Sequence, residues 1–159
     1  ATMVPFRLTQ QQFALRYTQC LERLAPRAIS SLRTHLSQPV QEGVTHVDVK
    51  IFLAEDDPHT PSIWIYYQGP DNRVDSNDPS LFPGRSLELP VGLEAIEEFD
   101  SRFFTNEKFG GLGITANVLM RWFAEMWWKA GGWNYKPSVT LHVHDGHGDA
   151  KPLELTEAA

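Results

Sequence analysis

Hydrophobic positions near the start of the chain recur every three or four residues, which is the spacing of one helix face. The pattern begins after Thr9 and Gln12, which have the spacing of a capping box. Pro26 interrupts it, so we predict a kinked helix or two abutting helices. The apolar positions are Phe13, Tyr17, Cys20, Leu21, Leu24, Ala28, Leu32 and Leu36.

The period then changes to two, which is typical of half-buried strands. Aliphatic residues occupy alternate positions from 47 to 53, with His46, Asp48, Lys50 and Phe52 between them, and residues 62–68 follow as the second strand of a hairpin. Residues 69–90 are rich in Pro, Asp, Asn, Ser and Gly, which indicates an irregular excursion with a short strand around 86–89. Residues 139–143 form another strand, and residues 152–156 form a last short strand or a frayed tail.

Two more helices are expected in the second half of the chain. One runs from Leu93 to about Phe104, with Leu93, Ile96, Phe99 and Phe103 on its inner side. The other runs from Ile114 to Ala130 and is stopped by two glycines at 131 and 132. It is apolar over a wide arc, which indicates a mostly buried helix. Its polar stripe consists of Asn117, Arg121, Glu125 and Lys129.

The order of these elements predicts an α+β domain. Strands are not regularly separated by helices, so a doubly wound parallel sheet is disfavoured. We expect an antiparallel sheet of three to five strands with helices packed mainly on one face, in the order α-β-β-(β)-α-α-β-(β). Residues 1–159 form one domain, and residues 1–7 and 147–159 are expected to be poorly ordered or peripheral.

Composition and charge narrow the classes of partner. The 159 residues are 42% hydrophobic and carry a net charge of −6, with lysines and arginines scattered along the chain. That pattern disfavours generic nucleic-acid binding and binding to anionic membranes. No apolar run reaches the roughly 20 residues of a membrane helix, and no signal peptide is visible. With Cys20 as the single cysteine, the expected location is the cytoplasm.

A run rich in histidine follows the strand at 139–143. Imidazole and carboxylate are the donor types that a borderline metal such as zinc accepts, and two histidines two residues apart share one face of a strand. The alternative is a solvent-facing strand end and a polar turn, because no established zinc spacing matches. The candidate ligands are His142, His144, Asp145 and His147.

Aromatic residues give a second candidate site. If the aliphatic residues of the strands point inward, their neighbours form an outward surface of mixed aromatic and polar character, which suits recognition. On the helix at 114–130, Trp128 projects beside the polar stripe, where a tryptophan is costly to leave in water. Either the first helix or the long loop covers it, or it is an anchor residue in contact with a partner. The candidate binding residues are Asp48, Lys50, Trp64, Tyr66, Arg121, Trp128, Trp133 and Tyr135.

No catalytic motif supports an enzyme. The chain has no Gly-x-Ser-x-Gly elbow, and the glycine-rich segment 109–115 lacks the ending of a phosphate loop. In general build, the chain resembles several small acidic bacterial immunity and binding proteins, although no motif and no residue role carries over. The expected function is a non-catalytic protein- or ligand-binding module, immunity- or adaptor-like. The alternatives are a metal-binding protein or metal-dependent enzyme that uses the histidine run, and a homodimer whose aromatic surface serves only self-association.

Overall fold

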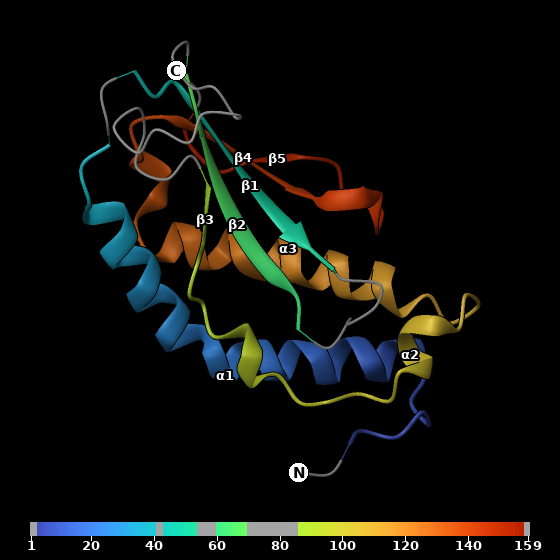
Figure 1. The fold of residues 1–159 in the computed structure, drawn as a ribbon. Helices are drawn as coiled ribbons and strands as arrows, with labels where there is room; N and C mark the ends of the chain where they lie inside the picture. Colours follow the sequence, from blue (N-terminus) through green and yellow to red (C-terminus); the bar gives the residue numbers. More distant parts are fainter. Residues whose placement is uncertain (1–2, 41–42, 54–59, 70–85, 158–159) are drawn as a thin grey trace.

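Two long helices, α1 (Gln10–Ser37) and α3 (Gly111–Lys129), pack against each other on one side of a five-stranded sheet (Figure 1). The computed structural model describes residues 3–40, 43–53, 60–69 and 86–157. It confirms an α+β fold, with helices and strands in roughly the predicted order. The predicted excursion at 69–90 falls mostly outside the described residues.

The sheet has the strand order β3-β2-β1-β4-β5. Its strands are β1 (His46–Phe52), β2 (Ser62–Gln68), β3 (Ser86–Glu88), β4 (Ser138–Val143) and β5 (Leu153–Glu154). Three of the strand pairs are antiparallel, but β1 and β4 are parallel. The sheet is therefore mostly antiparallel and has five strands, within the predicted three to five, but one pair is parallel where an antiparallel sheet was predicted. The long connection through α3 brings the chain back to enter β4 beside the start of β1, which makes the two strands run the same way.

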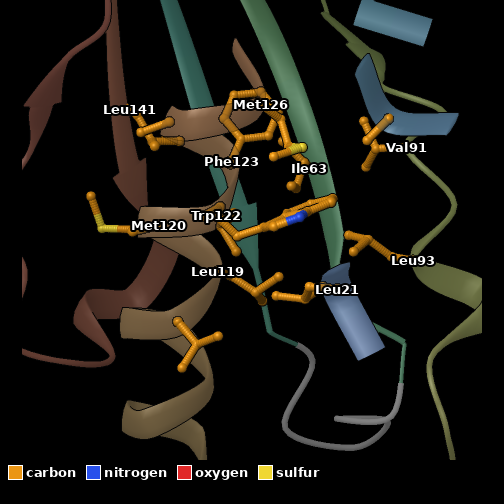
Figure 2. Close-up of a cluster of buried hydrophobic side chains, with 14 of the residues drawn as sticks. Leu21, Ile63, Val91, Leu93, Leu119, Met120, Trp122, Phe123, Met126 and Leu141 are labelled. Carbon is orange, nitrogen blue, oxygen red and sulfur yellow. The ribbon is translucent and has the colours of Figure 1, made fainter. Parts of the chain in front are cut away.

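The predicted alternation of the strands is confirmed. Val47, Val49, Ile51, Ile63, Ile65, Val139 and Leu141 are all fully buried on the side of the helices. From α3, the side chain of Trp122 reaches toward Ile63 of β2 and Leu93, as Figure 2 shows. The core therefore lies between the two long helices and one face of the sheet.

Helix α1 begins as the sequence predicted and continues through its proline. Thr9 and Gln12 form both hydrogen bonds of the capping box. Pro26 lies inside one uninterrupted helix rather than between two. Figure 1 shows α1 changing direction part-way along its length. A proline inside a helix produces such a bend because it lacks the N–H group and its ring meets the preceding turn.

The predicted helix from Leu93 to Phe104 was wrong. The segment contains only a 3-10 turn, η1 (Leu93–Ala95), and one helical turn, α2 (Arg102–Thr105). Between them, the backbone pairs with the N-terminal segment: the Val4 amide donates to the Glu98 carbonyl at 2.8 Å, and the Asp100 amide donates to the Val4 carbonyl at 2.9 Å. A continuous helix would use these groups internally.

Both ends of the described chain contribute to the core. Val4 and Leu155 are buried, although the sequence analysis expected residues 1–7 and 147–159 to be peripheral or poorly ordered. The two short strands at 86–88 and 153–154 are present. Pairing of β5 with β4 explains the burial of Leu155, whose amide donates to the Val139 carbonyl at 2.8 Å.

Candidate functional site

One face of the sheet points away from α1 and α3 (Figure 1). Polar and aromatic side chains alternate with the buried ones on this face. No described α-helix lies on that side. Most of its side chains are half-buried rather than fully exposed. We call this surface the outer sheet face, and it consists of His46, Asp48, Lys50, Phe52, Trp64, Tyr66, Gln68, Ser138, Thr140 and His142.

Asp48 is the centre of a hydrogen-bonded network on this face. Its Oδ1 atom lies 3.1 Å from Nε2 of His46 and 3.4 Å from Nε2 of His142. Gln68 donates its side-chain amide to Oδ2. The strand register brings these side chains close to Asp48 on β1. Gln68 of β2 is paired with His46, and His142 of β4 is paired with Lys50, and each of these partners lies two residues from Asp48 on the same face. The Asp48 side chain is only 16% exposed, so this carboxylate has a fixed position.

Next to this network, Lys50 lies among aromatic rings. Its Nζ atom is 5.0 Å from the ring centre of Tyr66, a cation–π distance. Lys50 is also the register partner of Trp64, whose indole N–H donates to Oγ of Ser62 at 3.2 Å. Burial raises the pKa of Tyr66, so its phenol stays protonated at neutral pH. The structure therefore brings together four of the predicted binding residues: Asp48, Lys50, Trp64 and Tyr66.

Trp128 and Trp133 form a separate pair beside β5. Their ring centres are 6.0 Å apart in an edge-to-face arrangement, and the two side chains are 40% and 43% exposed. The Trp128 indole N–H donates to the Leu155 carbonyl at 3.0 Å. The polar edge of Trp128 is thus covered by the strand end at 155, which was neither of the two covering elements considered from sequence. The rest of the ring still faces out.

The remaining predicted binding residues lie elsewhere. Tyr135 is half-buried, its ring 5.6 Å from that of Trp127, and it forms a side-chain hydrogen bond with Tyr67. Arg121 is exposed on α3, on the helix side of the sheet, away from the outer sheet face. On the same polar stripe, Glu125 and Lys129 form an ion pair at 2.8 Å.

The histidine run does not converge on one point. His142 faces Asp48, whereas His144 lies 3.2 Å from Asp145 and stacks at 4.5 Å on the ring of Phe52. His147 is half-buried in the segment that follows. Within the described ranges, no three His, Cys, Asp or Glu side chains are grouped so that they can hold a metal ion. The geometry of the described residues therefore gives no support to the predicted zinc site, and elemental analysis can test it.

Sequence reasoning missed three members of the Asp48 network: His46, Gln68 and Ser138. The Nδ1 atom of His46 lies 3.0 Å from Oγ of Ser138, the first residue of β4. The period of two places His46 on the same face as Asp48, which was a usable signal. Nothing in the sequence places Ser138 beside His46, because that contact depends on the parallel pairing of β1 and β4.

The chain matches no protein-family model, no curated protein and no solved structure. Among the described helices, none has the length and apolar character needed to cross a bilayer. A function can therefore be proposed only from the geometry of the described residues.

Proposed function

We propose that this protein is a binding module that recognises another protein through the outer sheet face. The observation that supports this is the one-sided packing of the fold. Helices α1 and α3 bury the aliphatic face of the sheet, while Trp64 and Tyr66 lie on the opposite face with no described α-helix over them. An aromatic surface of this kind is costly to leave in water and is typical of the centre of protein interfaces.

The same surface is already ordered before any partner arrives. Asp48 is fixed by His46 and Gln68, and Lys50 is held against the ring of Tyr66. Side chains that are fixed in advance lose less conformational entropy on binding, which favours affinity. The net charge of −6 favours a partner with a basic contact surface, because complementary charge speeds association.

The test is capture of a partner from native lysate, followed by measurement of its affinity for variants. Trp64→Ala removes an aromatic ring from the centre of the outer sheet face, and we expect the affinity to fall by about 30-fold or more. Leu15→Ala is the matched control, because Leu15 is 60% exposed on α1, away from the outer sheet face. A partner that binds wild type, Trp64→Ala and Leu15→Ala equally well would show that the surface assignment is wrong.

Self-association is the alternative use of the same face. Light scattering at high protein concentration separates the two. A monodisperse monomer supports a different protein as the partner. A dimer that Trp64→Ala dissociates, and that Leu15→Ala leaves intact, would mean that the outer sheet face binds a second copy of this chain instead.

A further inference from the structure

One corner of the outer sheet face contains a serine, a histidine and an aspartate in a chain of hydrogen bonds. Ser138 Oγ lies 3.0 Å from His46 Nδ1, and His46 Nε2 lies 3.1 Å from Asp48 Oδ1. Ser138 and His46 are the first residues of β4 and β1, and the parallel register places them side by side. A nucleophile within reach of a base, with the base oriented by a third group, is the general arrangement of nucleophilic catalysis.

Asp48 determines which nitrogen of His46 can act as the base. An ionised carboxylate only accepts hydrogen bonds, so His46 must carry its proton on Nε2 to donate to Asp48. In the neutral imidazole, Nδ1 then has a lone pair, and this atom faces the Ser138 hydroxyl. The hydrogen bonds therefore favour the tautomer in which His46 can take a proton from Ser138.

The carboxylate is itself held by a hydrogen bond from a second strand, and a third strand places a histidine near it. Gln68 on β2 donates to the second oxygen of Asp48, and His142 on β4 lies 3.4 Å from the first. With its side chain 16% exposed, Asp48 has little freedom to turn away from His46. The imidazole is thus oriented by a fixed group, as efficient general-base catalysis requires.

Ser138 opens onto a pocket that can hold a small substrate. The pocket has a volume of about 330 Å³, and besides Ser138 it is lined by Thr45, Tyr135, Lys136, Glu154, Thr156 and Glu157. Lys136 contributes one positive charge to this lining and the two glutamates contribute negative charges, which favours a neutral substrate such as an ester over an anionic one. Thr156 Oγ1 accepts the Val139 amide at 3.1 Å, and a hydroxyl that accepts one bond still has a proton to donate. The Thr156 hydroxyl is therefore the group in this lining that can donate to negative charge developing on a substrate oxygen.

We propose that Ser138, His46 and Asp48 form a catalytic site that hydrolyses small carboxylic esters. Ser138 Oγ attacks the ester carbonyl carbon while its proton passes to His46 Nδ1. The C–O bond to the alcohol breaks, and His46 returns the proton to the departing alkoxide, which leaves an acyl group on Ser138. Water then attacks that acyl group with His46 as base and releases the carboxylic acid and the serine. The inference does not depend on the proposed binding partner.

A fluorophosphonate probe tests the nucleophile directly, because it forms a stable adduct with an activated serine. We expect one adduct on the wild-type protein, located at Ser138 by peptide mass spectrometry, and none on Ser138→Ala. His46→Ala should slow labelling by about 10²–10⁴-fold, the usual contribution of a general base. Ser30→Ala is the matched control, because Ser30 is an exposed serine on α1, and its labelling rate should equal that of wild type.

Hydrolysis of p-nitrophenyl acetate gives the second measurement. We expect turnover by wild type and Ser30→Ala, and loss of it in Ser138→Ala and His46→Ala. Circular dichroism melting curves of all four proteins check that they are folded. The proposal is overturned if wild type forms no adduct, if the adduct lies on another residue such as Tyr135, or if a folded His46→Ala variant reacts at the wild-type rate.

Discussion

The aromatic cluster around Phe13 provides the sharpest test of the packing. Phe13 lies on α1 and is fully buried. Its ring centre lies within 4.8–6.1 Å of five other aromatic rings, those of Tyr17, Phe99, Phe103, Phe104 and Phe109. Four of the five belong to the segment 99–109, which contains little regular structure of its own. Phe13 therefore attaches this segment to the first helix.

Phe13→Ala removes the ring and leaves a cavity in the centre of that cluster. Such a substitution costs about 3–5 kcal/mol when the site is fully buried. Each aromatic pair contributes roughly 0.5–1.5 kcal/mol beyond the burial of apolar area. Because Phe13 has five aromatic partners, we expect the loss of unfolding free energy to lie near the upper end of that roughly 3–5 kcal/mol range. For a domain of this size, each kcal/mol lowers Tm by about 2–4 °C, which predicts a fall of roughly 10–20 °C.

Urea unfolding followed by circular dichroism measures the loss. Leu15→Ala is the control on the same helix: its side chain is 60% exposed, and the free energy of unfolding should change by less than about 0.5 kcal/mol. If Phe13→Ala lowers the free energy of unfolding by less than about 1.5 kcal/mol, with an unchanged dependence on urea concentration, the reasoning is refuted. A loss that small would mean that the ring does not pack closely against its five aromatic neighbours.

Three further predictions concern close packing, acid stability and metal binding. A Cβ atom at Gly132 would lie 2.2 Å from the fully buried ring of Trp127, so Gly132→Ala should lower the free energy of unfolding in urea by about 3 kcal/mol. At Gly131 a Cβ atom would meet open space, and only the φ of +90° opposes it, so Gly131→Ala should lower that free energy by about 1–2 kcal/mol. The hydrogen bond from Arg16 lowers the pKa of Glu97 to about 2 in the folded protein. Ionised Glu97 therefore stabilises the fold above pH 4.5, its pKa in the unfolded chain, and this stabilisation is lost as the pH falls toward 2. Glu97→Gln should therefore reduce the difference in unfolding free energy between pH 5 and pH 2.5, and an unchanged difference would contradict this. Elemental analysis of untagged protein should find no stoichiometric zinc, since the run at 142–147 does not converge.

The features that the sequence predicted correctly are those set by neighbouring residues. The capping box at Thr9 joins groups three residues apart, and it formed as expected. The inner residues of β1 and β2 follow from the period of two, because any strand places alternate side chains on one face. These signals do not depend on which strand lies beside which.

The features that failed depend on contacts between distant parts of the chain. Val4 pairs with the backbone at residues 98–100, and this pairing replaces the helix that local periodicity indicated. The parallel pairing of β1 with β4 likewise depends on the path of the chain through α3. No local pattern of apolar residues distinguishes a strand that will pair in one direction from a strand that will pair in the other.

The same reasoning explains why the predicted metal site and the structural site differ. Three histidines close together in sequence gave the visible signal, but the chain turns after β4, so His142 and His144 have different neighbours. His46 and Ser138 are 92 residues apart, and only the register of two parallel strands brings them into contact. Chemistry assembled across a sheet is therefore invisible in a single sequence.

Asp48 connects the two proposals, and for that reason it cannot separate them. It orients His46 for the proposed hydrolysis, and with Gln68 it fixes part of the proposed binding surface. Replacing Asp48 should disturb both functions at once. Ser138 and Trp64 separate the two proposals better although both lie on the outer sheet face, because Ser138 contacts His46 at one end of the strands and Trp64 lies beside Lys50 nearer the middle of the sheet. Loss of probe labelling in Ser138→Ala and loss of partner affinity in Trp64→Ala are therefore independent outcomes, and either proposal can fail without the other.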